Sequence, residues 1–251
     1  MRAFSIVGLT GSGKTSVIEK VIAALKERGF SVGSVKEIHY EAFKIDTEGK
    51  NTWRHRQAGA TTVTARAHYE TDIMYTGHLD IYEVLSHYKE EFVALEGVRD
   101  ANVPQISCCK EDEEPEITPL TIAISGRFAN NHTGFYKGLP IINGITETER
   151  LVELILEKSP ALMPDVGPEC CSVCGTDCKS FLAKCLKGEE SPENCALKGK
   201  KVSLIIGGKE IAMVPFVQNI LKNAVLGVVK ELKGYKKGGD IRVEFIDDEG
   251  I

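Results

Sequence analysis

Two kinds of hydrophobic pattern alternate along the first part of the chain. Short apolar runs are typical of buried strands, whereas apolar positions within residues 17–25 repeat at the spacing of one helical face. Gly29 ends that helix. A short helix is expected over 51–58, and a later helix begins with a capping box formed by Thr146 and Glu149. The expected strands cover residues 3–7, 32–35, 61–64, 92–95, 105–108 and 120–124.

Strands separated by helices are typical of a parallel sheet with helices on both faces. We therefore predict an α/β fold over residues 1–160, with a mostly parallel sheet and flanking helices. A proline-rich linker over 161–168 separates this domain from a cysteine-rich module over 169–199. Residues 200–251 have the pattern of a small ββαβ unit. Its expected elements are strands over 202–206 and 210–214, a helix over 216–232 and a strand over 241–246.

Composition narrows the class of protein further. The chain has 251 residues, of which 42% are hydrophobic and 27% charged, as in ordinary globular proteins. Its net charge of −5 does not provide the positive field of a general nucleic-acid or membrane-surface binder. No apolar run approaches the ~18 residues that a membrane span needs. We expect a cytoplasmic protein without nucleic-acid or membrane partners.

Residues 8–15 read GLTGSGKT and satisfy the phosphate-loop pattern G-x-x-x-x-G-K-[ST] in full. An apolar strand precedes the pattern and an amphipathic helix follows it, which is the context that the pattern requires. Glycines let backbone N–H groups converge on phosphates, and the helix N-terminus adds positive potential. Lys14 would reach the β- and γ-phosphates, and the Thr15 hydroxyl would bind Mg²⁺. The predicted nucleotide-binding residues are Gly8, Gly11, Ser12, Gly13, Lys14, Thr15 and Ser16.

A magnesium site also needs a carboxylate at the end of a buried strand. Glu96 supplies one directly after the apolar run 92–95. The alternative is a surface glutamate that closes a strand. Asp46 is a second candidate, in a loop that would face the γ-phosphate, although its other interpretation is a turn residue. Lys14, Glu96 and Asp46 are therefore the candidate catalytic residues.

Basic residues gather in the region that follows. Lys50, Arg54 and Arg56 are suited to a second ligand that carries phosphate, with helical spacing between Lys50 and Arg54. A solvated helix face is the alternative. The chain has no N-K-x-D motif, so the sequence does not predict a preference for guanine.

Residues 36–60, together with the phosphate loop and the tripeptides at 95–97 and 139–141, resemble the molybdopterin-guanine dinucleotide biosynthesis protein B family. The family pattern F-x-I-D-x-x-G-K-D-S-x-R-H-x-x-A-G-A is matched at Phe43, Ile45, Asp46, Gly49, Lys50, Arg54, His55, Ala58, Gly59 and Ala60. The chain departs from it at Asn51 and Thr52. Glu37 also stands where the family usually has histidine, which leaves His39 as the nearest imidazole.

This resemblance covers residues 1–158. It implies a GTP-binding P-loop protein of molybdenum or tungsten cofactor maturation that forms a homodimer and has weak GTPase activity. It also implies a partnership with the guanylyltransferase that attaches GMP to molybdopterin, and contact with the molybdopterin cofactor itself.

Six of the eight cysteines fall between residues 170 and 195, a clustering that favours a metal site over a disulfide scaffold. Four thiolates suit zinc or an iron–sulfur cluster. Cys171, Cys174, Cys178 and Cys195 resemble the 4Fe–4S modules of electron-transport complex subunits and corrinoid iron–sulfur proteins. One gap is a residue shorter than usual, so zinc remains an alternative.

The other cysteines have less specific interpretations. Cys170 and Cys185 could replace a ligand or be buried thiols. Cys108 and Cys109 fall on an expected strand, so one should face each side of the sheet as a buried thiol.

The favoured function is therefore a GTP-binding accessory protein of molybdenum or tungsten cofactor synthesis with Mg²⁺ and a C-terminal 4Fe–4S cluster. Two other classes remain open. One is a metal-insertion or cluster-carrier GTPase, in which hydrolysis gates release. The other is an electron-transfer or redox module whose nucleotide site is regulatory.

Overall fold

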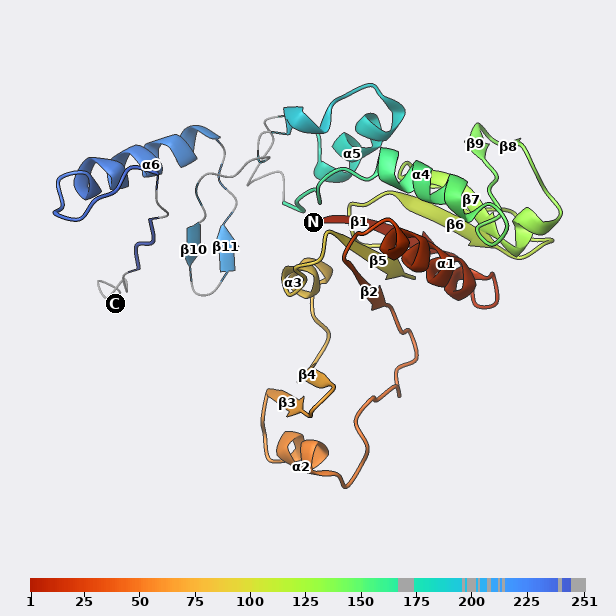
Figure 1. Ribbon diagram of the computed structural model, residues 1–251, viewed down its shortest axis with the longest axis horizontal. Coiled ribbons are helices and arrows are strands. Elements are labelled where there is room, and N and C mark those ends of the chain that lie inside the picture. Colours follow the sequence, from red (N-terminus) through yellow and green to blue (C-terminus); the bar gives the residue numbers. More distant parts are fainter. Residues whose placement is uncertain are drawn as a thin grey trace.

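The structure is a computed structural model, and it describes residues 1–166, 174–195, 197, 202, 204–206, 209–211, 213, 215–238 and 241–244. Its centre is a five-stranded parallel sheet in the order β2-β5-β1-β6-β7 (Figure 1). The residues of β1, β5, β6 and β7 are almost entirely buried, as expected for a sheet covered on both faces. The five strands are β1 (Arg2–Val7), β2 (Val32–Lys36), β5 (Phe92–Glu96), β6 (Gln105–Cys109) and β7 (Thr121–Gly126).

Helices cover both faces of this sheet. On one face, α1 (Lys14–Glu27) and α4 (Thr148–Lys158) pack against Phe4, Ile6 and Ile106. On the other face, α3 (Ile81–Ser86) buries Ile81 and Leu85 against the opposite side chains of the strands. The predicted α/β fold with a parallel sheet and flanking helices is confirmed.

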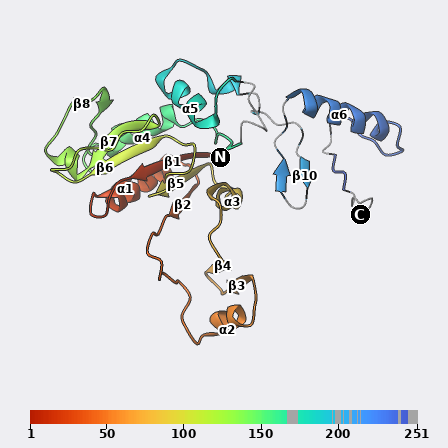
Figure 2. The ribbon, with the colours of Figure 1, turned by 180° about the vertical axis from the view of Figure 1, so that it is seen from behind.

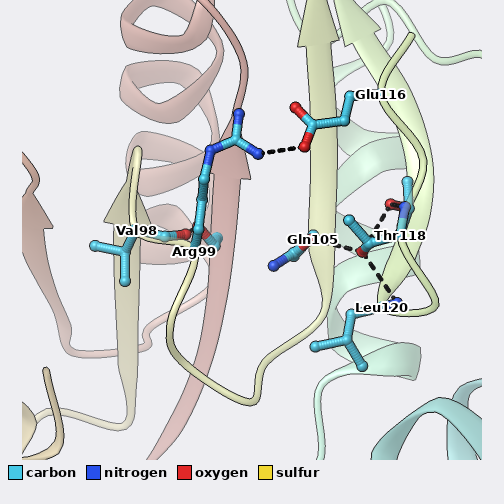
Figure 3. A network of polar contacts seen from close by, with 8 residues as sticks. Val98, Arg99, Gln105, Glu116, Thr118 and Leu120 are labelled. Atoms are coloured by element: carbon cyan, nitrogen blue, oxygen red, sulfur yellow. Dashed lines mark hydrogen bonds and ion pairs between the residues drawn. The ribbon is translucent and has the colours of Figure 1, made fainter. Parts of the chain in front are cut away.

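The connection from β5 to β6 crosses the sheet without forming a helix. The two strands lie on either side of β1, so residues 97–104 run back across its face. Val98, Ala101 and Val103 are buried in that crossing, and Ser5 Oγ donates a 2.6 Å hydrogen bond to the Val98 carbonyl. Arg99 of the same connection pairs with Glu116, which lies ahead of β7 (Figure 3).

Residues 37–80 form an arm that leaves the sheet at the end of β2 and returns ahead of α3. It carries α2 (Asn51–Gln57) and a hairpin of β3 (Thr62–Arg66) and β4 (Thr71–Tyr75), and it stands away from the sheet in both views (Figures 1 and 2). The expected strand over 61–64 exists, but it pairs with β4 instead of joining the parallel sheet. Strand β4 and helix α3 were not predicted from the sequence.

The predicted capping box at the start of α4 is wrong. Glu147 is the N-cap residue, and no side chain caps the helix. Asn143 Oδ1 instead accepts hydrogen bonds from the backbone N–H groups of Ile145 and Thr146, and it thereby fixes a turn just before the helix. Because residues 143–146 form this turn, α4 begins only at Thr148. Beyond β7 lie η1 (Arg127–Asn130), β8 (Phe135–Tyr136) and β9 (Leu139–Pro140).

The segment after α4 packs back onto the sheet domain. Ala161 bridges Arg2 at the start of β1, and Met163 is buried. Helix α5 (Cys178–Lys187) adds Phe181 and Leu182 to the same small core, around Leu120. The cysteine-rich segment is therefore held on the sheet domain by apolar contacts of α5, whether or not it binds a metal. A short helix, η2 (Pro192–Asn194), follows it.

The C-terminal region contains β10 (Leu204–Ile206), its antiparallel partner β11 (Lys209–Ile211) and α6 (Pro215–Val229). Two predicted strands and a helix are thus present, with the helix ending earlier than expected. The predicted last strand is wrong over its described part, since residues 241–244 are not in a strand; 245 and 246 lie outside the described residues. Within the described residues, none of the helices has the length and apolar character needed to cross a membrane.

Candidate functional site

The phosphate loop joins β1 to α1 at the carboxyl edge of the sheet, where open α/β sheets bind ligands. Gly13 is the N-cap of α1 with φ of 94°, and within the described part of the chain no side chain caps this end of the helix by a hydrogen bond. The leading N–H groups of the helix therefore stay available to an anion. Lys14 Nζ donates a 2.7 Å hydrogen bond to the Leu9 carbonyl within the loop. Burial lowers the pKa of Lys14, and the Glu96 carboxylate partly opposes that shift.

Close backbone contacts hold this loop in place. A Cβ atom on Gly8 would lie 1.9 Å from the Cys108 carbonyl oxygen, and φ at Gly8 is +147°. A Cβ atom on Gly126 would lie 2.3 Å from the Ser12 carbonyl oxygen, to which the Arg127 N–H donates at 3.0 Å. The ends of β6 and β7 thus pack directly on the loop, and only glycine fits at these two contacts.

Glu96 ends β5 beside the loop and is only 5% exposed. Its Oε1 accepts a 2.8 Å hydrogen bond from the Thr15 hydroxyl, and Lys36 Nζ donates to the same oxygen. Burial by itself would raise the pKa of Glu96. The hydrogen bonds from Lys36 and Thr15, with the positive charges of Lys36 and Lys14, outweigh burial and hold that pKa below its usual value. Glu96 is therefore an ionised carboxylate at the start of α1.

This pair of oxygen donors fits a magnesium ion. Mg²⁺ binds through oxygen ligands and is usually held by one or two protein groups together with phosphate oxygens and water. The Thr15 hydroxyl and the Glu96 carboxylate are hydrogen-bonded neighbours at the phosphate loop, and the carboxylate is charged. The fold thus brings together the two oxygen ligands that a magnesium site at the phosphate loop would use.

Lys36 was not assigned a role from the sequence. It is the last residue of β2, and its Cα lies opposite that of Glu96 in the parallel ladder. The available signal for Lys36 was its place as a charged residue directly after the expected strand over 32–35. It was not decisive, because the pairing of β2 with β5 could not be known from the sequence. Lys110 and Arg127, which follow β6 and β7 and lie near Gly11 and Gly13 of the phosphate loop, were not predicted to lie there for the same reason.

Asp46 lies in the arm, not beside Glu96. Its Oδ1 accepts a 2.7 Å hydrogen bond from the Thr52 hydroxyl, and Arg56 lies 3.7 Å from Oδ2, too far for a hydrogen bond. The carboxylate thus connects the loop before α2 to that helix. A catalytic role for Asp46 remains a prediction that would require the arm to move.

The three predicted phosphate-binding cations also belong to the arm. Lys50 is the N-cap residue of α2, and Arg54 and Arg56 lie in its last turn. Arg56 is engaged by Asp46. Within the described parts of the chain, Lys50 and Arg54 have no carboxylate partner, so their charges face solvent on one side of a short helix.

The cysteines fall into two groups. Cys108 and Cys109 are 1% and 5% exposed, and they pack into cores on opposite faces of the sheet, as predicted. Burial raises the pKa of Cys109 to about 11 and raises that of Cys108 further, so both are inert thiols. Near α5, Cys174 is exposed and Cys178 and Cys195 are partly exposed.

The predicted four-cysteine site is not assembled in the described structure. Cys170 and Cys171 lie outside the described residues. Among the residues that are described, no three His, Cys, Asp or Glu side chains are placed so as to hold a metal ion. Ligation by Cys171, Cys174, Cys178 and Cys195 therefore remains a prediction from spacing.

Known proteins resemble this chain over its sheet domain and, in one case, over nearly its whole length. A Methanocaldococcus jannaschii protein named as a candidate molybdopterin-guanine dinucleotide biosynthesis adapter protein is 29% identical over 252 residues, which cover 97% of each chain. The Haemophilus influenzae adapter protein of the same name is 28% identical over 131 residues, covering 49% of this chain and 73% of the relative.

The fold has a solved counterpart. The crystal structure of Bacillus subtilis MobB superposes with a TM-score of 0.53 at 24% identity, covering 64% of this chain and 99% of that one. Residues 3–125 match the family described as molybdopterin guanine dinucleotide synthesis protein B, or MobB. This range contains the phosphate loop, Lys36, the arm and Glu96. Over this range, the chain is similar to the MobB family.

Proposed function

We propose that this chain is a GTP-binding adapter protein in the biosynthesis of molybdopterin guanine dinucleotide, with weak GTPase activity. The observation that carries the proposal is the hydrogen bond between Thr15 and Glu96 at an open phosphate loop. The names of the relatives from M. jannaschii and H. influenzae support the adapter role.

The residues of the loop have distinct tasks in this proposal. Backbone N–H groups between Gly11 and Thr15 bind the phosphates, since no side chain of the described residues caps the start of α1 by a hydrogen bond. Lys14 leaves the Leu9 carbonyl and binds the β- and γ-phosphates. Thr15 and Glu96 hold the magnesium ion, which when bound stabilises the charge that develops on the phosphoryl group.

An adapter protein acts through partners. We propose that these are the guanylyltransferase that attaches GMP to molybdopterin, the molybdopterin cofactor and a second copy of this chain. The arm supports the first two, because Lys50 and Arg54 have no carboxylate partner among the described residues and offer their positive charge to a phosphate-bearing ligand. It also exposes apolar side chains, including Tyr40, Ile45 and Ile73, that a protein partner would cover.

We further propose that Cys171, Cys174, Cys178 and Cys195 bind a 4Fe–4S cluster. Sulfur donors suit iron–sulfur clusters and zinc alike. In support, the three described members are at least partly accessible, in contrast to the buried Cys108 and Cys109. Metal binding would have to bring the four thiols to within ligand distance of one another, as in small domains where metal binding and folding are coupled.

Nucleotide titration of the full chain tests the central claim. A fluorescent GTP analogue is titrated with and without Mg²⁺ into the wild type, Lys14→Ala and Lys20→Ala. Lys20 is exposed on α1 and serves as the control for removal of a lysine. We expect Mg²⁺-dependent binding by the wild type and Lys20→Ala, and severe weakening in Lys14→Ala. Equal affinities in all three would contradict the phosphate-loop assignment.

The adapter role needs its own assay. Purified guanylyltransferase is supplied with molybdopterin, GTP and Mg²⁺, and dinucleotide formation is measured with and without this chain. Stimulation by the wild type and by Lys20→Ala, with none from Lys14→Ala, is the expected result. No stimulation by any of the three proteins would contradict the adapter role while leaving nucleotide binding intact.

A further inference from the structure

The loop that follows β6 forms a tight turn beside the phosphate loop. The Glu113 N–H donates to the Lys110 carbonyl at 3.3 Å, and the Glu113 side chain returns to Lys110. Its Oε1 accepts from Lys110 Nζ at 2.9 Å, and its Oε2 accepts from the Lys110 N–H at 3.4 Å. Lys110 and Glu113 thus close the turn, and Glu111 and Asp112 form its tip.

This turn packs on the phosphate loop itself. A Cβ atom on Gly11 would lie 3.7 Å from Lys110 Cε, which is ordinary van der Waals contact. Because β6 pairs in parallel with β1, both strands end at the same edge of the sheet. The tip of the turn is therefore held at the carboxyl edge, next to the residues that would bind a nucleotide's phosphates.

Four successive carboxylates, Glu111 to Glu114, lie in or after this turn, and three of them are engaged. Glu111 Oε1 lies 3.6 Å from Arg127 Nε, and Glu113 is bonded to Lys110. Glu114 Oε1 accepts from Lys137 Nζ and from the Tyr136 hydroxyl, both at 2.7 Å. The Asp112 side chain is exposed and has no hydrogen-bond or ion-pair partner among the described residues.

A free carboxylate distinguishes the two purine bases. Guanine presents two adjacent donors, N1–H and the exocyclic N2–H₂, which the two oxygens of one carboxylate can accept together. Adenine presents an unprotonated N1 at the same edge, whose lone pair would face the carboxylate without a proton between them. A fixed carboxylate near a bound purine therefore favours guanine.

We propose that Asp112 reads the guanine base, with Lys110 positioning it against the phosphate loop. The proposal rests on nucleotide binding at the phosphate loop and adds the group that selects the base. It also accounts for the absence of an N-K-x-D motif from the sequence. The residues Lys110, Glu111 and Asp112 have the K-x-D spacing, but the position of the asparagine is taken by Cys109, a buried thiol of β6.

The variant Asp112→Asn gives a positive test. An asparagine amide accepts one hydrogen bond and donates another. It therefore matches xanthine, which has N1–H as a donor and a carbonyl oxygen in place of the N2 amine. Affinities for GTP, XTP and ATP are measured by calorimetry with Mg²⁺ for the wild-type full chain and the variant. We expect GTP to bind the variant about 10- to 100-fold more weakly and XTP to bind it more tightly by a similar factor.

The matched control is Glu114→Gln. It also removes one negative charge, and it does so from an exposed side chain two residues away from Asp112. It should keep the wild-type preference for GTP over XTP. Wild-type selectivity in Asp112→Asn, or an equal change in Glu114→Gln, would overturn the assignment of Asp112 while GTP binding itself stands. If the wild type binds none of the three nucleotides, both this assignment and the proposed nucleotide function fail.

Discussion

The hydroxyl of Thr15 donates a 2.8 Å hydrogen bond to Oε1 of Glu96, which joins the first turn of α1 to the end of β5. The two residues are 81 positions apart in the sequence, and the pairing of β1 with β5 brings them together. Lys36 donates to the same oxygen from the end of β2. Three neighbouring elements thus place one charged carboxylate beside the phosphate loop.

Replacing Glu96 with glutamine should reduce GTP hydrolysis far more than GTP binding. The change keeps the shape and removes the negative charge that would hold Mg²⁺, whereas the phosphates are still bound by the loop. Single-turnover hydrolysis and nucleotide affinity are measured on the same preparation. Unchanged Mg²⁺-dependent hydrolysis would place the essential carboxylate elsewhere, with Asp46 as the next candidate.

Acid should destabilise the wild type more than Glu96→Gln. The pKa of Glu96 is lowered by folding, so its contribution to stability is complete above its usual pKa and disappears as the pH falls through the lower, folded value. Urea unfolding curves at pH 6 and on the acid side of that window measure the difference. Other carboxylates titrate equally in both proteins, and the exposed control Glu19→Gln should follow the wild type.

Substituting Gly8 with alanine should destabilise the sheet domain by roughly 3 kcal/mol or more, since the methyl group adds overpacking to backbone strain. The added Cβ would lie 1.9 Å from the Cys108 carbonyl oxygen. Gly29→Ala is the control, because φ there is also positive but nothing lies within 4 Å. It should cost only about 1–2 kcal/mol. Similar losses in denaturant unfolding would contradict the steric argument.

Replacing Phe181 with alanine should detach α5 from the sheet domain. Phe181 is 3% exposed and packs with Leu120 and Met163, and such a truncation costs about 3–5 kcal/mol. Amide exchange should accelerate over residues 178–187 and stay slow in β5 and β6. The exposed control Lys184→Ala should exchange like the wild type. Unchanged exchange in Phe181→Ala would show that these apolar contacts do not hold the helix.

Cys178→Ser should abolish bound iron and sulfide in protein purified without oxygen, because a serine hydroxyl is a poor substitute for a soft thiolate ligand. Iron, sulfide and zinc are measured together with the visible spectrum. Cys109→Ala is the control, since this thiol is buried in the sheet domain and should not affect the metal content. A wild type that contains zinc and no iron would contradict the cluster assignment.

Local sequence was sufficient for the elements whose signals are contiguous. The pattern GLTGSGKT between an apolar strand and an amphipathic helix predicted β1, the phosphate loop and α1, because the glycines and the helix lie within a few residues of one another. The apolar run ending at Glu96 likewise predicted β5 and its carboxylate. In each case one short segment contains all the required information.

Pairing across the sequence was decided only by the tertiary structure. A strand near 62–66 was predicted from the sequence, yet it pairs with β4 in the arm, because strand partners depend on long-range contacts. The roles of Lys36 and of the Lys110–Glu113 turn also depend on which strands end side by side. The sequence by itself determined the phosphate loop and the fold class. Which distant side chains face that loop was determined by the order of the strands in the sheet.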